Sequence, residues 1–345
     1  MSAVYSAGEH KNHNFRASFQ TGFRNPSTQD QYIGFNIGNA VLIGSAPDNL
    51  VRFTETLPVS LTGQAFTGSA TTVMTGVNAY NNSYTATSAS AFGAAYLANP
   101  TPAGLLAASS LLTKSSANYV KPETVKAFDL GYRGDFKGFS FDINGYYNVY
   151  NNFIGNLNVV APYYGTATTS PNVAGGPADP GYQSAVAVLS GDTRVYQLYT
   201  NTDIEIHSLG FGVGVSKKVI GDFEVGANYN YAQFDFDQAK DPSFEAGFNT
   251  PKHRVKASIG NDKLFPNLGF NISGRWNSEY LWQSTFVDGM IDAATVFDAQ
   301  INYRIPKLKS TLKFGATNIG GKEYRQVLGA GLIGQQSFAS LTINP

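Results

Sequence analysis

Apolar and polar side chains alternate along residues 15–24, FRASFQTGFR. Successive side chains of a β-strand point to opposite faces of its sheet. The rings of Phe15, Phe19 and Phe23 therefore share one face. The other face carries Arg16, Gln20 and Arg24. This pattern predicts a strand with apolar surroundings on one side and polar surroundings on the other.

The same period of two recurs along most of the chain. A tilted strand needs about 9 to 11 residues to cross the hydrocarbon layer of a membrane, and many of the repeats are that long. Counted together, the repeats predict about ten strands joined in antiparallel order. Beyond the first, they lie at 125–133, 139–153, 206–217, 223–234, 255–260, 268–280, 296–305, 312–318 and 338–343.

The connections between these strands alternate between short and long. In an up-and-down antiparallel sheet every second connection lies at the same end, so all the long ones share one rim. Short periplasmic turns and long extracellular loops are typical of outer-membrane barrels. We therefore predict an all-β fold, an antiparallel up-and-down transmembrane β-barrel portion. The short connections lie at 135–138, 219–222, 263–267 and 306–310, and the long ones at 25–122, 155–194, 237–250, 283–293 and 320–335.

The composition agrees with a membrane location. Only 14% of the 345 residues are charged, against roughly 25% in a typical soluble protein. No apolar run approaches the ~18 to 20 residues of a spanning helix, so strands must cross the membrane if the chain lies in one. The formal net charge of +0 argues against nucleic acid as a partner. The lack of cysteine excludes disulfides and thiolate metal sites within this sequence.

The long connections are predicted to be irregular loops. Residues 25–122 are rich in Ser, Thr, Ala, Gly and Asn and give no sign of a separate domain, and residues 166–182 are rich in Pro and Gly. Two short helices are expected in the longest of them, at 88–97 and 101–112. In the second helix Thr101 is a suitable cap and Pro102 a suitable first residue.

Long polar side chains recur on the polar face of several predicted strands. We expect them to face a lumen that holds water or other protein, where charges of both signs form ion pairs and hydrogen bonds. These candidates are Arg16, Gln20, Arg24, Arg133, Arg275, Glu279 and Arg304. In the second long loop, Tyr163 and Tyr164 offer stacking area, and we expect them to contact a substrate.

Three stretches resemble segments of the TonB-dependent outer-membrane receptors, with features like those of Bacteroidetes members. Residues 16–27, RASFQTGFRNPS, resemble the family's strand ending in Gly-Phe-Arg-x-Pro. Residues 120–136, VKPETVKAFDLGYRGDF, are similar to its Lys-Pro-Glu segment, with Asp129 where a Glu is usual. Residues 314–326, FGATNIGGKEYRQ, resemble the end of its penultimate strand. The three stretches occur in the family's order and together span nearly the whole chain.

The resemblance implies that residues 1–345 are the C-terminal part of a receptor barrel of about 22 strands with a plugged lumen. No stretch resembles the family's plug domain or a signal peptide. Such a receptor would take up a scarce large nutrient (siderophore, vitamin, glycan or peptide) across the outer membrane of a Gram-negative bacterium. Its implied partners are the TonB–ExbB–ExbD complex, acting through an N-terminal part, outer-membrane lipid, the nutrient ligand and a surface lipoprotein. No cofactor is implied.

Other functions also fit a row of membrane strands. A stand-alone small porin or adhesin would need about ten strands to close around a narrow lumen. An outer-membrane barrel hydrolase would need a catalytic group, for which His207 with Asp203 and Glu205 is the best candidate. His10 and His13 lack a third metal ligand nearby, and a soluble β-sandwich is disfavoured by the strand lengths. We predict no catalytic or metal-binding residue and do not expect an enzyme.

Overall fold

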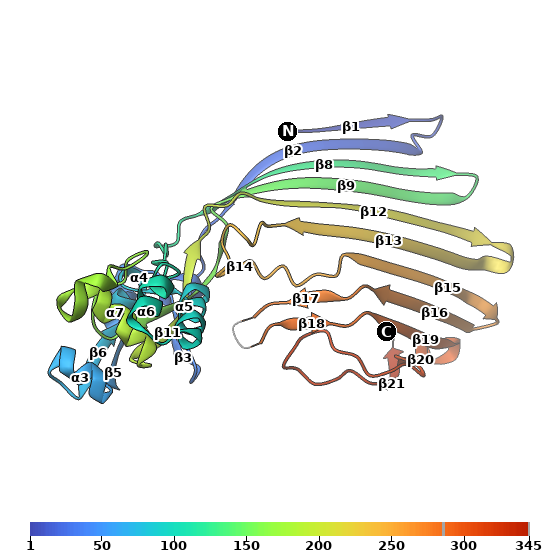
Figure 1. Ribbon diagram of the computed structural model, residues 1–345. Helices are drawn as coiled ribbons and strands as arrows, with labels where there is room; N and C mark the ends of the chain where they lie inside the picture. The colour runs from blue at the N-terminus through green and yellow to red at the C-terminus, as the bar shows by residue number, and fades with distance from the viewer. Residues whose placement is uncertain (285–286, 344–345) are drawn as a thin grey trace.

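The largest element of the computed structural model is one antiparallel sheet of eleven strands (Figure 1). The structure describes residues 1–284 and 287–343. The sheet is an up-and-down meander in chain order, with β1 and β21 at its edges. Its strands are β1 (Ser2–Ala7), β2 (His13–Arg24), β8 (Glu123–Phe136), β9 (Phe139–Asn151), β12 (Ile206–Val219), β13 (Phe223–Asp235), β15 (His253–Phe265), β16 (Leu268–Asn277), β19 (Ala294–Ile305), β20 (Ser310–Thr317) and β21 (Gln336–Ile343).

The predicted strands of this sheet are confirmed. Each predicted repeat corresponds to a strand, and β1 is an additional strand that the sequence pattern did not reveal. The predicted short connections are tight turns at one end of the sheet, and the long connections lie at the other end. In the β8–β9 hairpin, Lys137 and Gly138 have φ angles of 49° and 77°. These left-handed values are the ones that a two-residue hairpin turn requires.

One face of the sheet is apolar, as the alternation predicts. The rings of Phe19 and Phe128, on paired strands, lie 4.8 Å apart between their centroids. Large side chains on this face stay exposed; Phe15 is 47% exposed and Leu130 67%. A surface of this kind would be unfavourable in water and is suited to contact with lipid.

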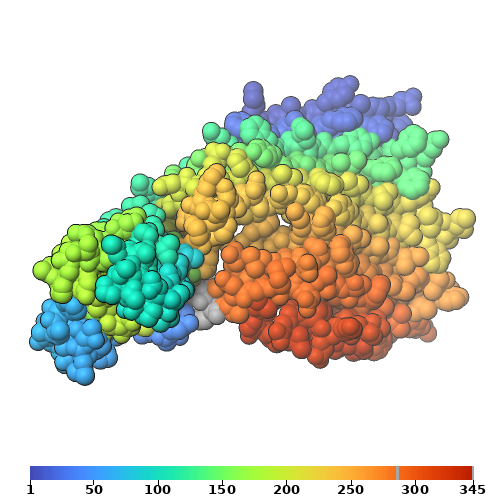
Figure 2. All heavy atoms as spheres, viewed as in Figure 1, coloured from blue at the N-terminus to red at the C-terminus, as the bar shows by residue number. Residues whose placement is uncertain are grey.

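Three of the long connections fold together into a compact unit. This unit lies beyond the end of the sheet from which the long connections leave (Figures 1 and 2). We call this unit, residues 25–122, 152–205 and 236–252, the cap. Its central sheet has the order β14-β10-β11-β4-β3, with β7 paired to β10, and β11 runs parallel to β4. The strands of the cap are β3 (Gly34–Asn36), β4 (Val41–Ile43), β5 (Thr54–Pro58), β6 (Thr71–Thr75), β7 (Tyr84–Thr85), β10 (Ile154–Pro162), β11 (Thr193–Asn201) and β14 (Phe244–Glu245), of which β5 and β6 form a separate two-stranded sheet. The helices of the cap are α1 (Thr28–Tyr32), α2 (Pro47–Arg52), α3 (Leu61–Thr67), α4 (Gly76–Asn81), α5 (Ala86–Ala98), α6 (Pro102–Ser109), η1 (Val173–Ala178) and α7 (Pro180–Leu189).

The long connections are not the irregular loops that their composition predicts, because they contain regular strands and helices. All three clusters of buried hydrophobic side chains in the described part of the chain lie in the cap. The largest cluster joins Val41, Leu157 and Phe244, one from each connection, at 0%, 2% and 0% exposure. Because each connection supplies only part of this core, no single segment carries the apolar periodicity by which a core element is recognised.

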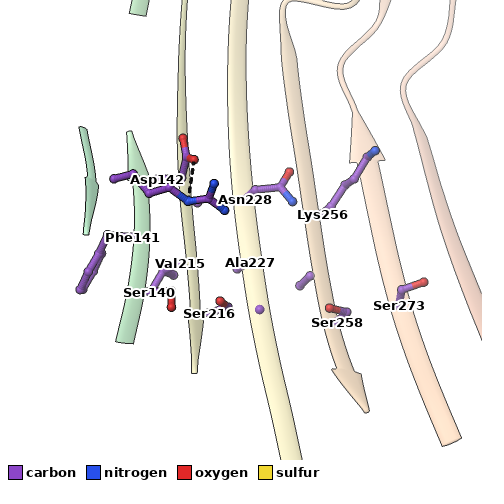
Figure 3. A pocket seen from close by; sticks show the side chains of 14 residues that line it. Ser140, Phe141, Asp142, Val215, Ser216, Ala227, Asn228, Lys256, Ser258 and Ser273 are labelled. Atoms are coloured by element: carbon purple, nitrogen blue, oxygen red, sulfur yellow. Dashed lines mark ion pairs between the residues drawn. The ribbon is translucent and has the colours of Figure 1, made fainter. Parts of the chain in front are cut away.

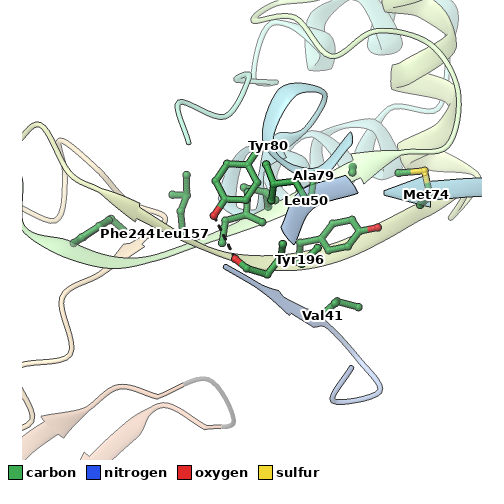
Figure 4. Close-up of a cluster of buried hydrophobic side chains, with 12 residues drawn as sticks. Val41, Leu50, Met74, Ala79, Tyr80, Leu157, Tyr196 and Phe244 are labelled. Atoms are coloured by element: carbon green, nitrogen blue, oxygen red, sulfur yellow. Dashed lines mark hydrogen bonds between the residues drawn. The ribbon is translucent and has the colours of Figure 1, made fainter. Parts of the chain in front are cut away.

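Tyr80 in α4 fastens the cap helices to the cap sheet. Its side chain is 3% exposed. Figure 4 shows its ring among the side chains of the largest buried cluster. Its single O–H is directed at two carbonyl oxygens, that of Tyr199 at 2.6 Å and that of Ile43 at 3.3 Å. Burial raises the pKa of Tyr80, so this hydroxyl keeps its proton and remains a donor. One side chain therefore holds together the parallel strands β4 and β11.

The two helices predicted in the longest connection are confirmed as α5 and α6. The Thr101 side chain accepts the N–H of Gly104 at 3.0 Å, and Pro102 occupies the first helical turn of α6. Among the described residues, no helix has both the length and the apolar character needed to span a membrane.

Candidate functional site

The polar face of the large sheet is a wall on which side chains of neighbouring strands lie in rows. Residues paired in the strand register point to the same face of a sheet. Figure 3 shows two adjacent rows, one with charged and amide groups and one with small residues. The strand register places the small residues nearer the short turns. The first row is Arg133, Asp142, Gly214, Asn228, Lys256 and Arg275, and the second is Ser140, Ser216, Gly226, Ser258 and Ser273.

Small side chains in the second row leave a hollow in this wall. A cavity of about 400 Å³ lies between the two rows, with Arg133, Asp142, Asn228 and Lys256 on its charged side. A second cavity of about 480 Å³ shares Ser216, Gly226 and Ser258 with the first and extends toward the short turns. We call the two cavities together the lumen trough.

Ion pairs join neighbouring strands along the wall. Arg133 lies 3.8 Å from Asp142, and Arg275 lies 2.7 Å from Asp298, measured from nitrogen to oxygen. Arg254 and Lys256 on β15 form no ion pair within residues 1–284 and 287–343. Positive charge on β15 is therefore left without a carboxylate partner in this part of the chain.

Two of the stretches that resemble the receptor family meet at the cap end of the wall. Arg24, in the Gly-Phe-Arg-x-Pro stretch, is paired in register with Glu123 of the Lys-Pro-Glu stretch, and their charged groups lie 3.2 Å apart. Glu123 is 8% exposed. Its carboxylate also accepts the N–H of Ile154 at 3.1 Å. This carboxylate therefore links the barrel wall to the first residue of cap strand β10.

The third family-like stretch folds the last long connection back onto the wall. Asn318 is 1% exposed, and its side-chain amide donates to the carbonyl oxygen of Lys322 at 3.1 Å. Its backbone N–H donates to the Asp298 carboxylate at 3.1 Å. Arg275, which pairs with that carboxylate, also donates to the Tyr324 hydroxyl at 3.3 Å. The stretch thus has a structural role at the end of the wall from which the long connections leave.

Most of the residues predicted to face the lumen lie on the polar face of their strands. Gln20 is in register with Ala127, and the Arg16 side chain lies over Gly131, where a Cβ would collide with it. Glu279 lies outside a strand, because β16 ends at Asn277, and it is an exposed residue of the following connection. The others on the polar face are Arg24, Arg133, Arg275 and Arg304. Their contact with a plug or with lumen water stays a prediction.

The two tyrosines expected to bind substrate lie in the cap. Tyr164 is 8% exposed, its ring stacks on Phe66 with centroids 5.2 Å apart, and its hydroxyl donates to Asp192 at 3.1 Å. Burial, with a smaller effect of Asp192, raises the pKa of Tyr164 to about 12. Tyr163 is partly buried against the hydrophobic cluster that contains Tyr164. Substrate contact stays a prediction for both, and in this conformation Tyr164 has little free surface for it.

Three histidines bind tyrosine hydroxyls on the apolar face, near the ends of their strands. These pairs are His13 with Tyr132 (2.7 Å), His207 with Tyr147 (2.8 Å) and His253 with Tyr229 (2.8 Å). His207 also lies 3.3 Å from Glu205. Rings with a polar edge are suited to the membrane boundary. Within the described ranges, no group of three or more His, Cys, Asp or Glu residues is placed to hold a metal ion.

A second polar cluster lies on the cap sheet. Glu245 on β14 accepts a short hydrogen bond from the Asn158 amide and another from Gln197 at 3.5 Å. Burial raises the pKa of Glu245 to about 7, and the nearby charge of Asp288 adds to the rise. No sequence signal indicated this cluster, because its members come from three strands of the cap sheet.

Comparisons with known proteins agree with this architecture. Residues 2–319 match the family described as TonB dependent receptor-like, beta-barrel. No curated protein sequence matches the chain. Similar solved structures include the ferric enterobactin receptor from Pseudomonas aeruginosa (TM-score 0.54, 12% identity, 99% of this chain and 39% of that chain) and the siderophore receptor PirA from Acinetobacter baumannii (TM-score 0.52, 10% identity, 99% and 40%).

A third similar structure is the FrpB iron transporter from Neisseria meningitidis (TM-score 0.52, 10% identity, 99% of this chain and 38% of that chain). At such identities the likeness shows the fold alone, and the chain spans less than half the length of each of these proteins. The family match covers most of the chain, so it shows the family as well as the fold. The chain belongs to the TonB-dependent receptor β-barrel family, whose members lie in the outer membrane of Gram-negative bacteria.

Proposed function

We propose that this chain serves the TonB-dependent uptake of a scarce large nutrient across the outer membrane. The observation that carries the proposal is the family match over residues 2–319, together with a polar sheet face that holds the lumen trough. The nutrient is a siderophore, vitamin, glycan or peptide. Energy would come from the TonB–ExbB–ExbD complex, and a surface lipoprotein would be a further partner.

Residues 1–345 would form the C-terminal part of the receptor barrel. Eleven strands are about half of the roughly 22 in a plugged outer-membrane transporter. The described sheet has free edges at β1 and β21, which supports pairing with further strands. A plug inside the complete barrel would then face the polar wall, and outer-membrane lipid would cover the apolar face.

The cap would receive the nutrient before it enters the barrel. It lies where the long connections meet, which is the extracellular end in barrels of this kind. Its own hydrophobic core makes it a preorganised surface, which lowers the entropy lost on binding. Tyr163, which is partly exposed, is the better placed of the two predicted substrate-contacting tyrosines.

The proposal is tested in the source bacterium. One strain lacks the gene for the complete protein, a second lacks TonB function, and a third carries the gene restored on a plasmid. Mass spectrometry of spent medium measures which solutes each strain removes. We expect one solute to be consumed by the wild type and the restored strain but by neither mutant.

Consumption that persists without TonB function would contradict the proposal and favour a porin or adhesin. Tyr163→Ala combined with Tyr164→Ala is then measured for binding of the solute identified. Unchanged binding would remove these two residues from the site while leaving the uptake proposal intact.

A further inference from the structure

The polar cluster around Glu245 contains buried oxygen atoms that receive no hydrogen bond. Gln197 is 3% exposed, and its Oε1 has no hydrogen-bond partner among the described residues. The Oδ1 of Asn156 is also buried and has no partner within these ranges. Buried polar atoms in native proteins are almost always paired, and an exception indicates a bound water or ion. Two free acceptors therefore lie in one small region of the cap.

The strand register brings these oxygens to the Glu245 carboxylate. Asn156 is paired in register with Glu245, and the Gln197 amide lies 3.5 Å from the carboxylate through its Nε2. Asn158, the register partner of Gln197, donates its amide to the same carboxylate. Alternate residues of a strand share one face. One carboxylate and three amides thus lie together on one face of the cap sheet.

A second carboxylate lies near this cluster. The charge of Asp288, in the connection 283–293, adds to the rise in the pKa of Glu245, so the two groups are within electrostatic range. Asn249 holds that connection beside the cap. Its Nδ2 donates to the Gln283 carbonyl oxygen at 2.9 Å, and its Oδ1 accepts the Gln283 N–H at 2.8 Å. Neither Glu245 nor Asp288 forms an ion pair in the described part of the chain.

We propose that this cluster binds a calcium ion, which fastens the connection 283–293 to the cap. Ca²⁺ takes carboxylate and amide oxygens in a flexible arrangement, whereas Mg²⁺ requires near-ideal octahedral geometry. Glu245 and Asp288 would supply the charge, and Asn156 and Gln197 the amide oxygens. A half-turn of the Gln197 amide exchanges its nitrogen for its oxygen, so Oε1 can face the ion. Water would complete the coordination.

The ion would be a fixed part of the cap and not the transported solute. Its site has two acidic side chains, and amide oxygens make up the rest. The inference departs from the sequence-based prediction of no metal-binding residue. The reason is that the four ligands come from separate stretches, which only the fold brings together.

The test uses the complete protein in detergent, stripped of bound ions with a chelator. Hydrogen exchange followed by mass spectrometry is measured on peptides covering residues 236–252 and 287–293, with and without calcium chloride. Extracellular calcium modules have dissociation constants of about 0.1 to 1 mM, so about 10 mM calcium should fill the site. An ion that binds only the closed cap should then slow exchange about 10- to 100-fold. Magnesium at the same concentration should have a smaller effect.

Three variants locate the effect. Glu245→Gln keeps the size of the side chain, removes its charge and should abolish the response to calcium. Gln197→Met removes a free oxygen and should raise the calcium concentration for half-maximal protection at least about tenfold, since even the hydrogen-bond partners of metal ligands are worth about 10- to 100-fold in affinity. Asp237→Asn is the matched control. It removes a carboxylate of the same connection that pairs with Lys240, and it should respond like the parent.

Two results would overturn the proposal. No response to calcium in the parent protein would leave the free oxygens to water alone. A full response in Glu245→Gln would show that calcium acts elsewhere, for example at lipid phosphates. If Glu245→Gln does not fold, the comparison of Gln197→Met with Asp237→Asn decides. The measurement requires no transport, so its outcome is independent of the uptake experiment.

Discussion

Phe244 is the side chain through which the β13–β15 connection joins the cap. It is 0% exposed in the largest cluster, its ring lies 5.6 Å from that of Phe236, and it occupies the space left by Gly155, where a side chain would collide with it. The backbone pairing of β14 with β10 involves two residues of each strand. The attachment of this connection therefore depends more on one buried ring than on the sheet.

Phe244→Ala should release residues 236–252 from the cap. Truncation of a buried Phe to Ala costs about 3 to 5 kcal/mol. Each 1.4 kcal/mol is tenfold in an equilibrium constant, so opening of β14 should become at least about a hundredfold more frequent. Hydrogen exchange followed by mass spectrometry measures this on the complete protein in detergent, using peptides that cover residues 236–252. Peptides from β9 should keep their protection, because the wall does not depend on this ring.

Leu97→Ala is the matched control for that experiment. Leu97 also belongs to the cap but is 78% exposed, so its truncation should leave all peptides unchanged. Unaltered protection of residues 236–252 in Phe244→Ala would refute the reasoning, since it would mean that backbone pairing and polar contacts such as those of Glu245 hold the connection without the ring. Loss of protection throughout the cap would also refute it, because the effect is argued to be local to one connection.

Three further changes test other parts of the structure. Glu123→Gln weakens the contact with Arg24 and should lower the free energy of unfolding by about 1 to 2 kcal/mol. The detergent-purified variant should therefore lose its folded migration on gels at a lower temperature than the parent protein. The raised pKa of Glu245 means that the folded cap binds a proton more tightly than the unfolded chain. Cap stability should therefore fall as the pH rises from about 4.5 to about 7, and Glu245→Gln should abolish this dependence in hydrogen exchange corrected for intrinsic rate. Asn318→Ala removes the side-chain donor to the carbonyl oxygens of Lys322 and Ile333 and should make residues 318–335 sensitive to added protease, whereas continued resistance would contradict the structural role of Asn318.

The position of every wall strand except β1 could be predicted from the sequence, because a strand between lipid and a polar lumen must alternate at every residue. That requirement is local, so residues 15–24 reveal it without any partner. The alternation of short and long connections is equally local, and it indicated which end of the sheet would carry the loops. The small discrepancies, such as the end of β16 before Glu279, arise where alternation continues by chance into a connection.

The cap and the arrangement of charges were decided only by tertiary structure. The core around Tyr80 and Phe244 gathers side chains from three connections, and each connection alone shows no period that marks a buried face. For the same reason, nothing in the sequence around Tyr164 indicates that Asp192 and Phe66 enclose its ring.

Composition showed that charges of both signs were present, but strand register determines which of them meet. Arg24 pairs with Glu123, which is 99 residues away in the sequence, while Lys256 is in register with the amide residue Asn228. Alternation depends on neighbours along the chain, whereas burial and ion pairing depend on neighbours in space. The sequence alone therefore determined the wall, and the fold determined what the wall and its cap can bind.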